Sequence, residues 1–167
     1  KRGIGCASHW TIDYTKNGDM VMFTGTNGIA VVKENDIAKL TEAGQTVDIE
    51  LISSPDLDPV FQGVDSEIRL NPSSYPDARG YVDTDQNIYH LYVSGHHFAL
   101  NLDTGITYHE TDIDVYQAIF IKTGNQATGA YLADKQGFLY RQNIGYSKAV
   151  VNGTVTGNPT SSDRSTL

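Results

Sequence analysis

The sequence repeats one local pattern, in which an apolar, alternating strand is followed by a glycine-containing turn and a second strand. The three instances join residues 19–24 to 29–32, residues 88–93 to 96–102, and residues 127–133 to 138–141. The Asn27-Gly28 pair is a strong hairpin signal, because both residues tolerate a positive φ. Three such units in one chain predict an all-β fold built from antiparallel hairpins.

Further elements are expected around these hairpins. Residues 47–51 and 118–121 are predicted strands, and residues 37–43 a two-turn helix capped by Asn35 or Asp36 and ended by Gly44. Residues 53–77 contain four prolines and are predicted to be a long connection, with a short ordered piece at 66–70. We therefore expect one β-blade domain over residues 1–150, followed by an irregular tail over residues 151–167.

Short antiparallel strands with frequent turns are typical of sandwiches, barrels and propellers. Repeated hairpins that end in glycine turns favour propeller-like blades, which are four-stranded antiparallel sheets. A β-sandwich is the alternative.

The charge balance limits the classes of partner. Acidic residues outnumber basic residues 20 to 12, and the net charge is −8. A surface that grips nucleic acid or an anionic membrane needs clustered Lys and Arg, and Lys1-Arg2 is the only adjacent basic pair. Cys6 is the only cysteine, which suggests folding in a reducing compartment. No apolar run approaches the roughly 18 residues that a membrane helix needs.

Two polar clusters are candidate ligand sites. His96 and His97 are neighbours in a predicted strand, so their side chains point to opposite faces and do not chelate one metal; His90 has no clear carboxylate partner. Residues 83–87 resemble the start of a calcium loop. The EF-hand pattern then requires Gly and Glu where this chain has Ile88 and Ser94, so a hairpin turn is the better interpretation.

Carboxylate pairs and the thiol are the remaining chemical candidates. Asp56 with Asp58, and Asp112 with Asp114, are the kind of pair that glycosidases use, but nothing in the sequence sets their spatial separation. Cys6 lies among small residues and is predicted to be buried rather than nucleophilic. No nucleophile elbow, phosphate-binding loop or zinc-protease motif is present. We predict a protein that is not an enzyme, with no catalytic, cofactor-binding or metal-binding residues.

The opening of the sequence, residues 2–9 followed by 19–32, resembles a unit of the neck and tail proteins of tailed bacteriophages. In that family a Gly-Cys-Ala or Gly-Ile-Ala start precedes a strand, a glycine turn and an aliphatic strand. Residues 87–92, 99–105 and 137–140 are similar to the family's next blades, so the resemblance covers roughly residues 2–146. The family includes the head-completion plug that stabilises packaged DNA and the tubular tail nozzle, both built on β-propellers, and it has no catalytic residues.

This resemblance implies a virion structural protein of a phage neck or tail, assembled in the host cytoplasm. It would form part of a channel that retains or guides DNA, and its expected partners are other virion proteins and further copies of itself. Contact with packaged DNA would be non-adhesive, and no membrane partner is expected. A receptor- or glycan-binding adhesin or fibre module, suggested by the ten tyrosines, is one alternative. A glycoside hydrolase-like enzyme using paired carboxylates is the other.

Overall fold

In the computed structural model, the described residues are 4–41, 47–111, 115–123, 126–134, 136–137, 139–142, 150–151 and 154–155. Most of them lie in antiparallel strands, so the predicted all-β class is confirmed. Sheet A contains β1 (Asp13–Tyr14), β2 (Met20–Phe23), β3 (Ile29–Val32) and β4 (Ile49–Leu51). Sheet B contains β5 (Arg79–Asp83), β6 (Ile88–Val93), β7 (His96–Asn101) and β8 (Thr107–Thr111). Sheet C contains β9 (Gln117–Thr123), β10 (Gln126–Ala133) and β11 (Leu139–Gln142).

The helices of the described residues are short. The α-helices are α1 (Glu34–Ile37) and α2 (Asp58–Phe61). The 3₁₀ turns are η1 (His9–Thr11), η2 (Gly25–Asn27), η3 (Ala38–Thr41), η4 (Pro55–Leu57) and η5 (Pro72–Asp77). No helix in the described part of the chain is long and apolar enough to cross a membrane.

All three predicted hairpins form. In the second hairpin, Ser94 and Gly95 have φ values of 54° and 79°, the left-handed backbone that a two-residue hairpin turn needs. The first hairpin differs in its turn. Its last pair is Phe23 with Ile29, and the positive φ values belong to Gly25 and Gly28 rather than to Asn27, so η2 makes a wider loop than the expected Asn-Gly turn.

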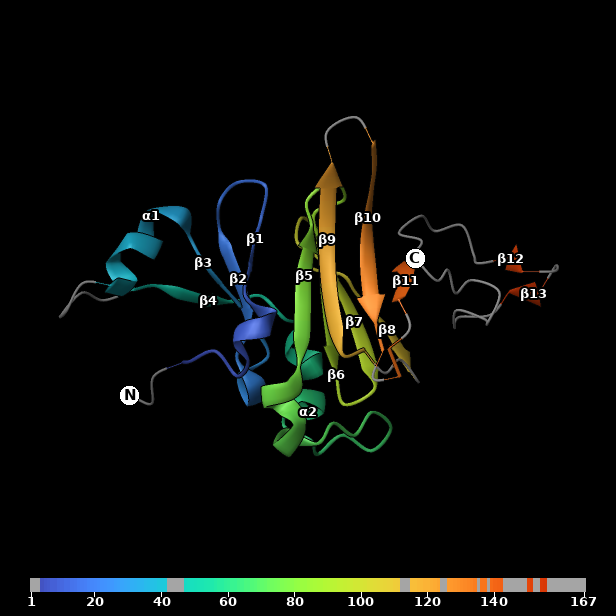
Figure 1. Cartoon of the computed structure of the whole chain (residues 1–167). Coiled ribbons are helices and arrows are strands. Elements are labelled where there is room, and N and C mark those ends of the chain that lie inside the picture. The colour runs from blue at the N-terminus through green and yellow to red at the C-terminus, as the bar shows by residue number, and fades with distance from the viewer. Residues whose placement is uncertain are drawn as a thin grey trace.

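The three main sheets are stacked face to face. One core cluster joins side chains of sheets A and B, including Phe23 and Phe98, and a second joins Tyr81 of sheet B to Ala118 and Ala130 of sheet C. The first strands lie side by side, since β5 contacts both β1 and β9. Figure 1 shows β1, β5 and β9 close together, while the last strands β4 and β8 lie far apart on either side. In the described residues none of these sheets closes on itself.

Sheet B is the central layer, and its side chains are buried on both faces. All six residues of β6 are buried, including His90. Leu91 belongs to the cluster facing sheet A, whereas Tyr92 belongs to the cluster facing sheet C. A strand covered on both sides needs no polar face, which explains why this segment is almost continuously apolar or aromatic.

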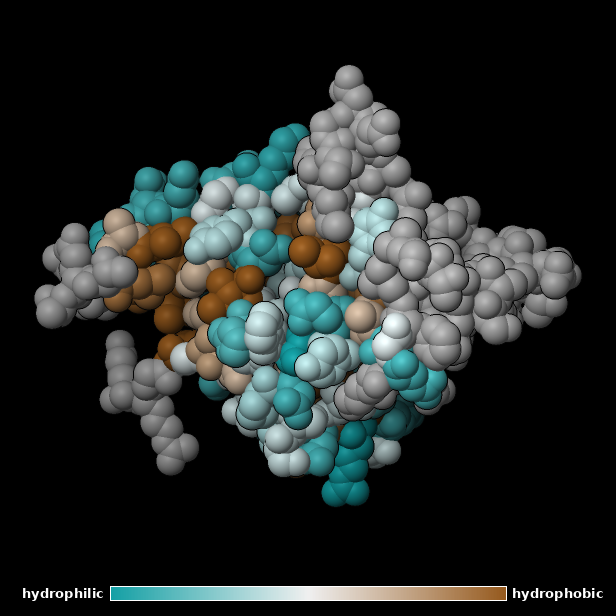
Figure 2. Space-filling view, in the orientation of Figure 1, coloured by the Kyte–Doolittle hydropathy of each residue, from teal (hydrophilic) through white to brown (hydrophobic). Residues whose placement is uncertain are grey.

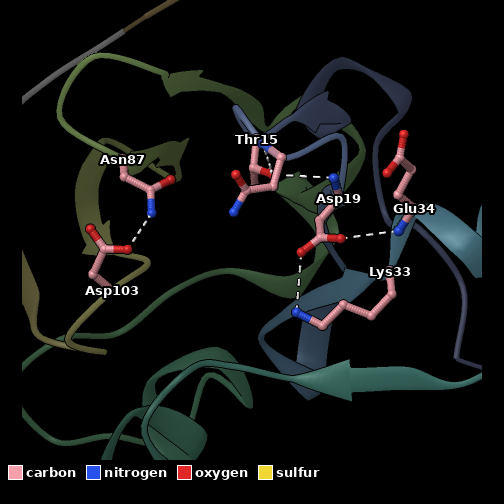
Figure 3. Close-up of polar contacts among 7 residues, drawn as sticks. Thr15, Asp19, Lys33, Glu34, Asn87 and Asp103 are labelled. Atoms are coloured by element: carbon pink, nitrogen blue, oxygen red, sulfur yellow. Dashed lines mark hydrogen bonds and ion pairs between the residues drawn. The ribbon is translucent and has the colours of Figure 1, made fainter.

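The predicted helix is shifted and held differently. It begins at Glu34, so Asn35 and Asp36 lie inside α1 rather than capping it, and Gly44 lies outside the described residues. The capping group comes from another segment. Asp19 Oδ1 accepts a hydrogen bond from Glu34 N at 3.0 Å, and Asp19 Oδ2 pairs with Lys33 Nζ at 3.1 Å (Figure 3). The prediction failed because a cap supplied by a distant residue has no local signature.

The long connection over residues 53–77 is more ordered than expected. Prolines occupy the first or second position of η4, α2 and η5. Phe61, Leu70 and Tyr75 are buried in the cluster between sheets A and B. The Phe61 ring lies 5.7 Å from Phe23 of sheet A and 5.5 Å from Phe98 of sheet B, measured between ring centroids. The expected ordered piece at 66–70 is neither helix nor strand. This segment closes one end of the core rather than simply linking two sheets.

In the predicted irregular tail, β12 (Val150–Val151) pairs with β13 (Thr154–Val155). The rest of residues 151–167 lies outside the described residues.

We expect Phe61→Ala to lower the free energy of unfolding by about 3–5 kcal/mol, because it leaves a cavity between the rings of Phe23 and Phe98. Val64→Ala, in the same segment but 70% exposed, is the matched control and should change stability by less than about 0.5 kcal/mol. Urea unfolding followed by circular dichroism measures both. If both substitutions changed the free energy of unfolding by the same small amount, Phe61 would not be part of the hydrophobic core.

Candidate functional site

The adjacent histidines point to opposite faces of sheet B, as the strand pattern predicts. His97 is buried on the face toward sheet C, while His96 contacts Phe98 on the face toward sheet A. Each imidazole is hydrogen-bonded to a second histidine. Pairing across strands was not predicted, because the sequence does not give the register that brings distant histidines together.

On the face toward sheet C, three side chains form a linear relay, which we call the β6–β8 relay: His90, His97 and Glu110. His90 Nδ1 lies 2.9 Å from His97 Nε2, and His97 Nδ1 lies 3.0 Å from Glu110 Oε2. His97 and Glu110 are direct cross-strand partners, and His90 is one strand further in. The sequence showed no clear carboxylate partner for these histidines, and the structure shows that this partner is Glu110. Its carboxylate end reaches solvent, whereas His90 is only 4% exposed.

The hydrogen bonds of the relay assign its protons. The bond from His97 lowers the pKa of Glu110, which is therefore an ionised acceptor at neutral pH, and His97 Nδ1 carries the donated hydrogen. Burial and, secondarily, the neighbouring His97 lower the pKa of His90 well below its usual value, so His90 is neutral. With His97 as the neutral tautomer that carries its hydrogen on Nδ1, a neutral His90 donates from Nδ1 to His97 Nε2. Its Nε2 is then a buried lone pair, and it finds no hydrogen-bond partner among the described residues.

A second imidazole pair lies on the other face of sheet B. His96 Nδ1 is 3.0 Å from His109 Nε2, and this pair is only partly buried. Burial and, next, the neighbouring His96 lower the pKa of His109. Sheet B thus carries one imidazole–imidazole hydrogen bond on each face, one deeply buried and one near the surface.

The described residues contain no group of three or more His, Cys, Asp or Glu side chains arranged to hold a metal ion. The β6–β8 relay is linear, and both nitrogens of His97 already have hydrogen-bond partners. A chelating set needs several lone pairs that converge on one point. The geometry of the relay suits proton storage rather than metal coordination.

The segment that resembles a calcium loop is a hairpin turn. Asp83 Oδ1 accepts hydrogen bonds from Asp85 N at 2.9 Å and Gln86 N at 3.1 Å, so this carboxylate serves the turn backbone. Asn87 has a φ of 55°, and its side-chain amide donates to Asp103 Oδ1 at 2.6 Å (Figure 3). These contacts confirm the hairpin interpretation of residues 83–87.

The carboxylate pairs and the cysteine are not brought into a site. Asp56 and Asp58 are exposed at the junction of η4 and α2. Asp112 and Asp114 lie outside the described residues. The prediction that Cys6 is buried is wrong: it is exposed, and its thiol donates to Ser8 O at 2.9 Å. Cys6 lies ahead of η1, before the chain enters the core, so its small apolar neighbours gave a misleading signal.

A second feature lies near the beginnings of the first strands, where Trp10, Arg79 and Tyr116 form a ladder. The Arg79 guanidinium carbon lies 5.3 Å from the Trp10 ring centroid and 5.7 Å from the Tyr116 ring centroid. Arg79 Nε donates to Tyr116 O at 2.7 Å and Nη1 donates to Asp77 O at 2.8 Å, so the guanidinium is held in place. The two rings are 47% and 58% exposed. The ladder is a rigid, partly open surface of two aromatic rings and one cation.

The ladder joins residues near the first strands of the three sheets: Trp10 lies in η1, Arg79 is the first residue of β5, and Tyr116 immediately precedes β9. Arg79 meets Tyr116 and, further along, Tyr81 meets Phe120, so β5 and β9 run in the same direction. At the sheet A side, Asp13 Oδ2 accepts a hydrogen bond from Val82 N at 2.7 Å.

Other exposed apolar side chains lie on or just before these strands. They are Ile12, Tyr14 and Ile119, and Ile119 points away from sheet B because its neighbours Ala118 and Phe120 pack toward it. We use the name first-strand surface for the ladder of Trp10, Arg79 and Tyr116. Figure 2 shows apolar residues over α1 and β2 and a smaller apolar patch over β9 on this side of the molecule. Large exposed apolar patches on a folded domain mark interaction surfaces.

No family model matches the sequence, and neither the characterised proteins nor the solved structures compared with it gave a significant match.

We expect Arg79→Ala to lower the free energy of unfolding by about 1–2 kcal/mol, because it removes a charged hydrogen-bond donor and the cation between two rings. Trp10 is the only tryptophan, so its fluorescence reports on the ladder directly, and its emission should shift to longer wavelength. Arg69→Ala, at an exposed site outside the ladder, is the control. Unchanged Trp10 emission in Arg79→Ala would contradict the ladder.

Proposed function

We propose that this protein is a non-enzymatic structural component of the neck or tail of a tailed bacteriophage. In this proposal its sheets are propeller-like blades in a channel wall that retains or guides DNA. The observation that carries the proposal is the stack of antiparallel meanders whose first strands lie side by side while the last strands diverge (Figure 1). Blades arranged around an axis have this geometry. A two-sheet sandwich would have two layers, whereas sheets A, B and C make three.

The number of sheets favours assembly with other chains. Propellers usually contain four to eight blades, so three sheets leave a ring open. The remaining blades would come from further copies of the chain or from other virion proteins. The first-strand surface supports this role, because Trp, Tyr and Arg are the residues that most often carry binding energy at protein interfaces.

The net charge of −8 fits a channel wall that DNA passes without sticking. A polyanion is repelled by an acidic surface and is retained by a basic one. Within the first-strand surface the one cation, Arg79, is held by backbone carbonyls and stacked rings.

We expect the purified chain to form oligomers, and we expect the double substitution Trp10→Ala with Tyr116→Ala to raise the dissociation constant by at least tenfold, the effect of losing about 1.4 kcal/mol or more. Light scattering over a concentration series measures the assembly, and negative-stain images show whether particles are ring-shaped. Tyr108→Ala, an equally exposed tyrosine on β8, is the matched control. A monomer at every concentration would refute the open-ring proposal.

The exposed rings of Trp10 and Tyr116 favour a glycan-binding module as the second candidate function. Aromatic side chains offer a flat apolar face beside a polar group, which suits contact with sugars. In that case we expect binding on a glycan array that is lost in Tyr116→Ala and kept in Tyr108→Ala. A protein that assembles and gives no signal on a broad array would exclude this candidate.

A further inference from the structure

The β6–β8 relay lies at the contact between sheets B and C. Phe120 of sheet C stacks on Tyr81 at 6.2 Å, and Tyr81 stacks on His90 at 4.7 Å. His90 in turn stacks on His97 at 5.1 Å, and His97 on Tyr92 at 4.5 Å. These rings form one continuous stack from sheet C into the middle of sheet B. A positive charge on His90 would therefore lie within the contact between sheets B and C.

Counting protons shows where an added proton must go. The ionised Glu110 fixes a hydrogen on His97 Nδ1, and the bond between the two imidazoles already contains one hydrogen. The nitrogen left for a further proton is His90 Nε2, which is buried and has no partner among the described residues. A charged imidazole in that position would have an N–H without an acceptor and away from water, which is strongly unfavourable.

We propose that the β6–β8 relay is an acid-sensitive joint: protonation of His90 Nε2 requires access to water, and sheet C separates from sheet B to provide it. Protonation of His90 acts on the contact between sheets B and C, because the relay lies on the face of sheet B opposite sheet A. On the other face, the His96–His109 pair is only partly buried. This inference concerns the chain itself and does not depend on the proposed virion role.

The surroundings of His90 offer the added charge little compensation. Among the described side chains on this face, the titratable or charged groups of sheet B are Arg79, Tyr81, Asp83, Tyr92, His97, Tyr108 and Glu110. The Asp83 carboxylate accepts hydrogen bonds from the turn backbone, and the Glu110 carboxylate accepts one from His97. Sheet C contributes the apolar residues Ala118, Phe120, Ala130 and Leu132.

The sign of the pH dependence follows from the lowered pKa of His90. The open form takes up a proton near the ordinary imidazole pKa of 6.5, and the closed form does so only at much lower pH. The closed form is therefore favoured fully above pH 6.5 and progressively less below it. Glu110, whose pKa is also lowered, acts in the same direction at lower pH. One proton taken up on opening changes the opening constant by up to about tenfold per pH unit.

The test is amide hydrogen exchange of the full chain between pH 7.5 and 5.5, corrected for the intrinsic pH dependence of exchange. We expect protection of β9 and β10 to fall by up to about tenfold per pH unit below pH 6.5, while β2 and β3 keep theirs. In His90→Phe, which keeps a flat ring in the stack without a titrating group, the pH dependence of β9 and β10 should disappear. His109→Phe, which disrupts the imidazole pair on the other face, should keep it.

Imidazole NMR signals of the unmodified chain give a second measurement that needs no variant. We expect His90 to become protonated with the same midpoint at which β9 and β10 lose protection. Three results would overturn the proposal: protonation of His90 while β9 and β10 stay protected, equal loss of protection in all three sheets, or the same acid response in His90→Phe. If acid acted only on the assembly of the chain into oligomers, the unmodified chain and His90→Phe would lose protection equally. That outcome is the third of these results and would overturn the proposal.

Discussion

The burial of sheet B on both faces is the constraint on which the other features of this structure depend. Leu91 and Phe98 pack toward sheet A, and Tyr81 and Tyr92 pack toward sheet C, so one four-stranded sheet supports two separate clusters. A strand in such a position has no solvent-facing side for polar groups. His90 is polar and central, so it must satisfy its hydrogen bonds inside the protein or leave an atom unsatisfied. The β6–β8 relay is the result.

The same arrangement separates what the sequence could predict from what it could not. The hairpins followed from local turn chemistry, as Ser94 and Gly95 show, because the backbone conformation of a tight turn depends on the residues within it. The sequence also predicted which face of the sheet each histidine is on relative to its neighbour, because successive side chains in a strand point to opposite faces. The partners of His97 did not, because they depend on which residues of β6 and β8 lie opposite β7. Register across three strands is a property of the whole sheet.

Segments outside the hairpins were predicted less well for a related reason. The prolines of residues 53–77 correctly indicated irregular backbone, but Phe61 and Tyr75 fill the core between two sheets that the sequence could not yet place together. The ladder of Trp10, Arg79 and Tyr116 combines residues more than one hundred positions apart. The sequence alone did not predict this ladder. It gives the assembly proposal a specific surface, whereas the sequence offered only a large number of tyrosines.

The contacts of the segment before β1 bear on the order in which the protein folds. Each main sheet joins strands that follow one another in the chain, so each can form from local pairings as the chain emerges. The opening residues behave differently. Ser8 donates to Ala78 O at 2.9 Å, and Thr11 O accepts from the Tyr89 hydroxyl at 2.7 Å, across separations of 70 and 78 residues. Ser8 and Thr11 are synthesised before β5 and β6, so they reach these partners only after sheet B has been made. The segment before β1 is therefore among the last parts of the first two layers to be completed.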